Sequence, residues 1–244
     1  MLLSASKYPF LAALLFLATP LVATAEPGHS GSEQHDQSAN QDAESVGDPY
    51  PLTTDPVSGE PLTADAVAYA HQGRHLRFNT EQTMKLFLQD PAKHLAALDE
   101  TLIAYQRPHY PLMTCPVSGG ELGSMGEPVE IVVGNRLVRL CCAGCEKSVR
   151  ENPEPVIAKL DAAVVKEQSK NYPLTTCPIS GGELGSMGEP VHYVIANRLV
   201  KLCCAGCVAT LEKDAAAALK KLDTASKSTD SPEAKSDEHD GHDH

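Results

Sequence analysis

The residues of this 244-residue chain with the clearest chemical potential are its eight cysteines. They form two groups with the same spacing, in which a solitary cysteine precedes a Cys-Cys-Ala-Gly-Cys stretch. The first group is Cys115, Cys141, Cys142 and Cys145, and the second is Cys177, Cys203, Cys204 and Cys207. Thiolate sulfur binds soft and borderline metal ions, among them Cu(I) and Zn(II). The pattern therefore predicts two thiolate metal sites.

The two cysteine groups belong to a longer internal repeat. The stretch from Tyr110 to Cys145 is nearly identical to the stretch from Tyr172 to Cys207. A third, more divergent copy begins at Tyr50 and keeps the same frame without any cysteine. Its residues at the cysteine positions are Asp55, Asn79, Thr80 and Thr83. We therefore expect three tandem modules, of which only the second and third carry thiols.

Each repeat predicts the same order of elements. A turn rich in proline, serine and glycine comes first, followed by two short strands with a tight connection and then by two helices. In the second repeat we expect strands at 129–133 and 136–140, a short helix ending near 151 and a longer one from about 154 to 170. In the first repeat we expect helices at 81–89 and 94–106. The expected fold class is α+β, as three small ββαα modules of treble-clef type.

The predicted hairpin brings the solitary cysteine to the other thiols. An antiparallel hairpin returns the chain to its starting point, so Cys115 should meet the cysteines that follow the second strand. Cys141 and Cys145 are four residues apart, which would place both on one helical face, and a helix N-terminus favours the thiolate form. We expect these three to be ligands and Cys142 to complete or exchange the site. The equivalent residues of the third repeat are Cys177, Cys203, Cys207 and Cys204.

The number of sulfurs bears on the choice of metal. Four would suit tetrahedral Zn(II), whereas three alone would suit trigonal Cu(I). Met125 and Met187 lie in glycine-rich loops, where their thioethers would favour copper or would only pack the loop. His192 replaces a strand glutamate of the other copy and is a further candidate ligand. The sequence leaves the choice between zinc and copper open.

The layout resembles two related families, the TRASH and YHS metal-binding domains. TRASH domains carry a cysteine followed by a Cys-x3-Cys stretch, and Cys115 with Cys141 and Cys145 is similar to that pattern, with a longer loop before the hairpin. YHS domains begin with Asp-Pro-Val-Cys-Gly and close with an Asp-Pro helix. The first repeat resembles them at 55–59 and 90–95, with serine and asparagine in place of the family's cysteines. The resemblance implies heavy-metal sensing, binding or trafficking.

The two ends of the chain predict export and disordered tails. Residues 1–25 combine Lys7, an apolar run and an Ala-Thr-Ala cleavage site, which is the pattern of a signal peptide. Segment 26–49 has almost no large apolar side chains and should be a disordered linker. The modules are expected at 50–107, 108–170 and 171–225, followed at 226–244 by a disordered tail. This tail ends in HDGHDH, which would capture metal weakly or be a solvated acidic segment. The expected location is periplasmic or secreted.

The charge of the chain disfavours some classes of partner. A formal net charge of -12 argues against nucleic acid and anionic membranes. After the predicted signal, no apolar run reaches the ~20 residues of a membrane span. We expect a metal ion as the ligand, with a metal-transport protein or a metalloenzyme as the candidate partner protein.

Other interpretations of the cysteines are open. An even number of cysteines in an exported chain is also typical of a disulfide-stapled interaction module without metal. The Cys-x-x-Cys spacing of Cys142 and Cys145 is that of redox proteins, but no thioredoxin-like βαβ pattern surrounds it. The recurring turn serines have no recurring histidine beside them, which disfavours a hydrolase. The sequence therefore predicts a non-enzymatic, exported protein that binds Zn(II) or Cu(I) for metal buffering, trafficking or resistance.

Overall fold

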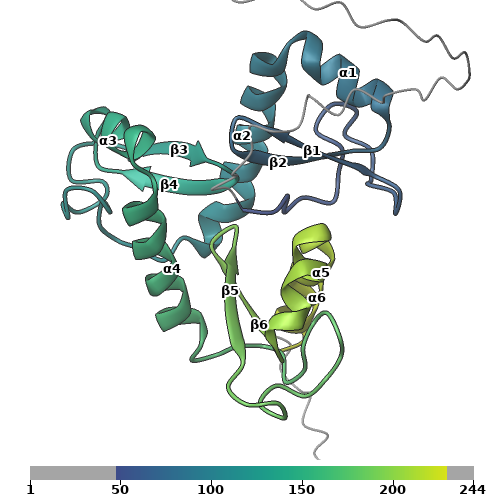
Figure 1. The fold of residues 1–244 in the computed structure, drawn as a ribbon. Coiled ribbons are helices and arrows are strands. Elements are labelled where there is room, and N and C mark those ends of the chain that lie inside the picture. The colour runs from purple at the N-terminus through teal and green to yellow at the C-terminus, as the bar shows by residue number, and fades with distance from the viewer. Residues whose placement is uncertain (1–47, 230–244) are drawn as a thin grey trace, which may run out of the picture. The chain divides into compact units, whose positions relative to one another are not determined.

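The computed structural model describes residues 48–229, and their architecture is α+β (Figure 1). Three small units follow one another along the chain, and each consists of a two-stranded hairpin with the helices that come after it. We number these modules 1 to 3 in the order of the sequence repeats. The predicted signal peptide, the predicted linker up to residue 47 and the histidine-rich end from residue 230 lie outside the described residues.

Each module is built around one antiparallel hairpin. The strands are β1 (Val67–His71), β2 (Arg74–Phe78), β3 (Val129–Val133), β4 (Arg136–Leu140), β5 (Val191–Ile195) and β6 (Arg198–Leu202). In all three hairpins the first residue of one strand lies opposite the last residue of the other. Both turn residues have positive φ angles in module 3, 50° at Ala196 and 58° at Asn197, as a type I′ turn requires. The two strands predicted for the second repeat are confirmed.

Helices follow each hairpin. They are α1 (Glu81–Gln89), α2 (Pro91–Gln106), α3 (Glu146–Glu151), α4 (Glu154–Gln168), α5 (Val208–Lys213) and α6 (Ala215–Thr229). The short 3-10 turns are η1 (Arg107–His109), η2 (Ala143–Cys145) and η3 (Ala205–Cys207). Within the described part of the chain, no helix is both long and apolar enough to cross a membrane.

Two helix boundaries differ from the prediction. Helix α2 begins at Pro91 instead of residue 94, because the Asp90 side chain accepts a hydrogen bond from the Lys93 N–H and proline is favoured in the first helical turn. Helix α6 continues to Thr229, beyond the predicted module boundary at residue 225.

The core of module 2 joins its hairpin to its helices. Ile131, Val138 and Leu140 from the strands pack with Val149 and Leu160 from the helices, and each is at most 6% exposed. Burial of such a side chain contributes about 1.5–3 kcal/mol. The solitary cysteine and the first cysteine after β4 belong to the same buried cluster. The thiols of this module are therefore part of its core.

Strand β3 buries side chains on both of its faces. Val132 is 8% exposed and packs against the core of module 1, which includes Leu98 and Leu102 of α2. Helix α2 contacts β3 and β4, and α4 contacts β5 and β6 in the same way. The long helix of one module is therefore shared with the hairpin of the next module, a contact that the strand pattern did not predict.

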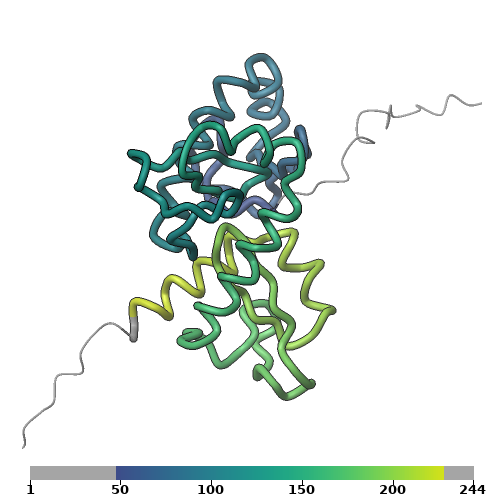
Figure 2. Tube along the Cα trace, turned by 90° about the vertical axis from the view of Figure 1, so that its left-hand side faces the viewer, coloured from purple at the N-terminus to yellow at the C-terminus, as the bar shows by residue number. Residues whose placement is uncertain are grey.

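A glutamine at the end of each shared helix fixes this joint. The buried Gln106 side chain donates a hydrogen bond to the Asn135 carbonyl at 2.8 Å and accepts one from the Leu137 N–H at 2.9 Å. Gln168 repeats the arrangement on the β5–β6 hairpin, with both hydrogen bonds at 2.8 Å. Figure 2 traces the backbone through these joints. The hairpin turns of modules 2 and 3 are thus each held by a side chain of the preceding module.

Arg136 is a fully buried cation at the start of β4. Its guanidinium donates to Asp48 at 2.6 and 2.7 Å and to Asp161 at 2.6 Å. Asp48 also accepts from the Ala196 N–H at 2.7 Å, which stabilises a turn residue held at positive φ. The Arg–Asp pair recurs in every module at 2.6 Å, as Arg74–Asp99, Arg136–Asp161 and Arg198–Asp223. Removing one partner of a buried pair leaves a charge uncompensated, so the network fixes how the modules meet.

Candidate metal centre

The solitary cysteine of module 2 is held in a tight turn. The Cys115 carbonyl accepts from the Gly119 N–H at 2.9 Å, and the Cys115 N–H donates to the Gly120 carbonyl at 2.7 Å. Gly119 has a φ of 77°, a left-handed conformation that glycine adopts without a steric penalty. The Lys159 ammonium of α4 donates to the Pro116 carbonyl at 3.1 Å and ties the turn to the helix. The Cys115 side chain is thereby fixed in a fully buried position.

Cys141 and Cys145 come from the end of β4 and from the turn that follows it. Cys141 directly follows Leu140, the last residue of β4, and Cys145 ends the 3-10 turn η2. The Cys145 N–H donates to the Cys142 carbonyl at 3.3 Å and closes this turn. The expectation that the two thiols share one helical face is wrong, because Cys141 precedes the helix. A single 3-10 turn brings the sulfurs together instead.

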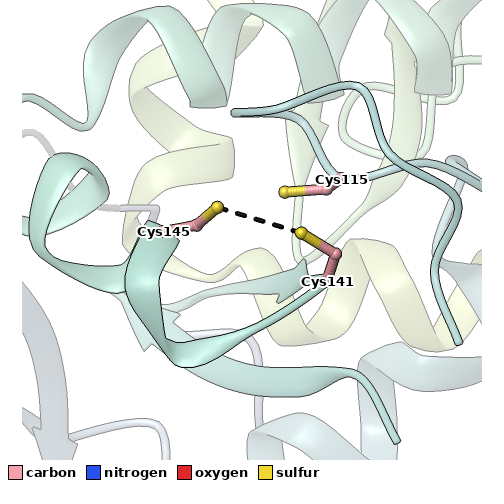
Figure 3. Close-up of side chains that lie close together, drawn as sticks. All are labelled: Cys115, Cys141 and Cys145. Carbon is pink, nitrogen blue, oxygen red and sulfur yellow. Dashed lines mark hydrogen bonds between the residues drawn. The ribbon is translucent and has the colours of Figure 1, made fainter. Parts of the chain in front are cut away.

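The three sulfurs of module 2 point toward one another (Figure 3). The Sγ atoms of Cys115, Cys141 and Cys145 all lie within 4.8 Å of each other, and those of Cys141 and Cys145 are 3.9 Å apart. A metal–sulfur bond is about 2.3 Å, so three sulfurs in a plane around one ion would be about 4.0 Å apart. The arrangement therefore suits one ion bound by all three sulfurs.

Module 3 contains a second copy of this triangle. The Sγ atoms of Cys177, Cys203 and Cys207 lie within 4.8 Å of each other, and those of Cys203 and Cys207 are 3.8 Å apart. These three thiols are 1%, 5% and 8% exposed, so the site is shielded from water. All eight cysteines of the chain are free thiols. The disulfide-stapled module stays the alternative prediction.

The environment of each triangle separates its thiols by pKa. Burial raises the pKa of Cys115, but hydrogen bonds from the side chain and backbone of Ser118 and its neighbours outweigh burial and bring the pKa to about 6. Cys177 has a pKa of about 6 for the same reasons. Burial and the adjacent thiols raise the pKa of Cys145 and Cys207 to about 12. Cys115 and Cys177 thus favour the thiolate form, whereas Cys145 and Cys207 hold their protons until a metal binds.

A serine hydroxyl lies beside each triangle. Ser118 Oγ is 3.3 Å from Cys141 Sγ, and Ser180 Oγ is 3.2 Å from Cys203 Sγ. Ser118 also accepts a hydrogen bond from the Gly120 N–H at 3.2 Å, which is the turn role that the sequence suggests. Each site therefore presents three sulfurs and one neighbouring hydroxyl.

Cys142 and Cys204, the remaining predicted ligands, lie outside the triangles but next to them. Cys142 Sγ is 4.0 Å from Cys141 Sγ, and Cys204 Sγ is 3.9 Å from Cys203 Sγ. Neither joins the group of three sulfurs that lie within reach of one ion. The structure thus brings together six of the eight predicted ligands and places the other two at their edge.

The other candidate ligands stay away from the triangles. Met125 and Met187 are each 70% exposed, so their side chains do not pack the glycine-rich loops. His192 is exposed on β5. His192 belongs to neither of the ligand groups found among residues 48–229.

Comparison with protein-family models, with curated proteins and with solved structures finds no match to this chain. The resemblance to TRASH and YHS domains therefore stays a prediction. The two sulfur triangles are the feature from which a function can be inferred.

Module 1 has a carboxylate where the other modules have the solitary cysteine. Asp55 is 1% exposed. Its Oδ1 accepts from the N–H groups of Val57 and Ser58 at 2.8 and 3.1 Å. Its Oδ2 accepts from the Asn79 N–H at 2.7 Å and from the Thr83 hydroxyl at 2.8 Å, and these two residues stand at positions of cluster cysteines. The carboxylate joins the turn, the strand end and the helix start, as an ion would in modules 2 and 3. The sequence shows the substitution but not these four hydrogen bonds.

Proposed function

We propose that this chain is an exported metal-binding protein that holds one soft metal ion in module 2 and one in module 3. The observation that carries the proposal is the pair of three-sulfur triangles, each with spacing suited to one ion. A thiolate ready at neutral pH at Cys115 and Cys177 supports it further. The function is metal buffering, trafficking or resistance, and it requires no catalysis.

Cu(I) is the metal that the donor set favours. Three thiolates match the trigonal coordination of Cu(I), whereas structural Zn(II) sites are almost always tetrahedral. The hydroxyls of Ser118 and Ser180 lie 3.3 and 3.2 Å from Cys141 Sγ and Cys203 Sγ, nearer than the sulfurs of Cys142 and Cys204 at 4.0 and 3.9 Å. A hydroxyl is a harder donor than a thiolate and suits a soft ion less well. Zn(II) with a fourth, oxygen ligand is the competing occupant.

Features of the sequence support the remaining parts of the proposal. The similarity of the cysteine spacing to TRASH domains supports metal trafficking and a treble-clef-like ββαα module. The predicted signal peptide supports a periplasmic or secreted location, where a metal-transport protein or a metalloenzyme would be the partner. Module 1, in which Asp55 takes the place of the ion, would be a metal-independent scaffold or docking module.

Element analysis of protein purified without oxygen tests the proposal. We expect two metal ions per chain, one for each triangle. Cys115→Ser should lower the content to one ion, and adding Cys177→Ser should lower it to none, because each change removes a buried ligand. His192→Ala is the matched control, since this side chain is exposed and outside both triangles. Retention of both ions by the double variant would contradict the proposal, as would metal-free wild-type protein with its thiols paired in disulfides.

A further inference from the structure

Each triangle has one thiol beside it that the metal site itself does not require. Cys142 and Cys204 fall outside the triangles, yet their Sγ atoms are 4.0 Å from Cys141 Sγ and 3.9 Å from Cys203 Sγ. Because a metal–sulfur bond is about 2.3 Å, one ion can contact both sulfurs of such a pair. The pair and the triangle share one sulfur. An ion can therefore pass from one to the other without leaving that shared ligand.

In module 3 the outer thiol is also the most accessible thiol, whereas in module 2 Cys142 and Cys145 are both partly buried. In module 3 the triangle thiols are at most 8% exposed, whereas Cys204 is only partly buried. Gly206 has no side chain that could cover this sulfur. A Cβ added at Gly206 would lie 3.7 Å from Cys204 Sγ. Gly144 stands in the same relation to Cys142. A closed site therefore has one sulfur at its edge that an incoming group can reach.

The internal repeat carries the outer thiol in both modules. Both modules keep the Cys-Cys-Ala-Gly-Cys stretch unchanged, although the helices that follow it differ at most positions. Cys142 and Cys204 pack against the cores of their modules from partly buried positions.

We propose that Cys142 and Cys204 are the ligands through which Cu(I) enters and leaves the two triangles. The inference rests on the proposed function, because it assigns a transfer role to the edge of the same sites. The donor is a Cu(I) complex with low-molecular-weight thiolates, which has the ligand chemistry that the outer sulfur can replace.

The transfer is a ligand exchange without a change in oxidation state. A bond from copper to Cys142 Sγ forms while a bond to one donor thiolate breaks, and Cys141 then replaces the second donor thiolate. Copper moves inward as bonds to Cys115 and Cys145 form and the bond to Cys142 breaks. Each proton lost by a protein thiol goes to a departing donor thiolate or to water, and copper remains Cu(I) throughout. Cys141 stays bound during the whole transfer.

Copper release measured in the full chain tests the role of the outer thiols. The protein is loaded with Cu(I)–glutathione without oxygen, and the rate of release to excess bicinchoninate is followed by absorbance in a stopped-flow instrument. The variant with Cys142→Ser and Cys204→Ser should still bind two ions at equilibrium but release them roughly tenfold more slowly. The variant with Gly144→Ala and Gly206→Ala keeps every thiol and places a methyl group 3.7 Å from each outer sulfur. It should slow release by a smaller factor.

Three outcomes bear on the inference in different ways. Release at the wild-type rate from both variants would overturn it, since access would then not depend on the outer sulfurs. Loss of copper from the Cys142→Ser and Cys204→Ser variant would also overturn it, because these residues would then be obligatory ligands. The proposed function is judged separately by metal content, and it fails if the wild-type chain takes up no Cu(I) or if the chain without Cys115 and Cys177 keeps both ions.

Discussion

Replacing Asp55 with asparagine tests whether a carboxylate takes the structural place of an ion in module 1. The asparagine oxygen can keep the two N–H donors of the turn. Its amide nitrogen then faces the Asn79 N–H, which donates to Asp55 Oδ2 at 2.7 Å in the native protein. The Thr83 hydroxyl has a second acceptor, the Thr80 carbonyl at 2.9 Å, so it is not left without a partner. The substitution therefore leaves one buried donor unsatisfied.

The cost follows from this count of hydrogen bonds. A buried donor without a partner costs about 1–3 kcal/mol, and loss of the charge weakens the remaining bonds by about 1 kcal/mol more. We expect Asp55→Asn to lower the local free energy of unfolding of module 1 by about 2–4 kcal/mol. At 1.36 kcal/mol per factor of ten, amide exchange should become roughly 30- to 1,000-fold faster. Thr83→Val removes one bond of the four and should cost about 1 kcal/mol.

Hydrogen–deuterium exchange with mass spectrometry measures this change in the metal-loaded full chain. Peptides from α1 and β2 report on module 1, and peptides from α6 are the internal reference. Ser58→Ala is the matched control, because its hydroxyl accepts only from the Glu60 N–H at the surface while its own N–H still reaches Asp55. Exchange in Asp55→Asn within about threefold of wild type would show that the carboxylate does not hold the module together.

Acid should remove the difference between wild type and Asp55→Asn. Burial raises the pKa of Asp55, but the hydrogen bonds from Asn79, Val57, Thr83 and Ser58 hold it below its ordinary value. The stabilisation is therefore complete above the unfolded-state pKa of about 3.9 and is lost as the pH falls through the lower folded-state pKa. The variant lacks this contribution at every pH, so the two exchange profiles should converge below about pH 4.

Three further predictions concern the metal sites. Chelation of the metal should speed amide exchange in α4 and α6 while α1 keeps its protection, because only modules 2 and 3 have sulfur triangles that bind an ion. An equal increase in exchange in all three helices would contradict this prediction. The affinity for Cu(I) should rise about tenfold per pH unit near neutrality for each thiol proton displaced. This pH dependence follows because burial raises the pKa of Cys145 to about 12. Competition with a chelator at several pH values measures the affinity. An affinity that does not change with pH would contradict the prediction. Ser118→Cys puts a fourth sulfur beside Cys141, where the serine oxygen is now 3.3 Å away, and should shift module 2 from Cu(I) toward Zn(II). Metal content after mixed loading measures the shift, with the unchanged module 3 as reference.

Local signals account for what the sequence could predict of the fold. Strands β3 and β4 were predictable because two short apolar runs and the Gly-Asn turn between them act within a few residues. The meeting of Cys115 with the thiols after β4 was also predictable, because an antiparallel hairpin must return the chain. The prediction placed Cys145 with Cys115 and Cys141 correctly, but the shared helical face on which it relied is not present. Sequence spacing does not distinguish a 3-10 turn from the first turn of an α-helix.

Contacts between distant residues account for what could not be predicted. Val132 faces away from its own core and is buried only because module 1 covers it. Gln106 reads as an ordinary helix residue, and its two hydrogen bonds to the next hairpin depend on how the modules meet. The sequence shows that Asp55 stands in place of the solitary cysteine. Its role in place of an ion becomes evident only from the positions of its four hydrogen-bond donors. The outer position of Cys142 depends on side-chain direction, which adjacent cysteines do not specify.

The glutamine at the end of each long helix gives the assembly of this protein a direction. Gln106 reaches forward to the hairpin of module 2, and Gln168 reaches forward to that of module 3. The part of the chain that is synthesised first is also the part that closes its turn without an ion, so it can mature before any copper arrives. Each later hairpin then forms against a surface that is already in place. The sites would become competent one after the other, in their order along the chain.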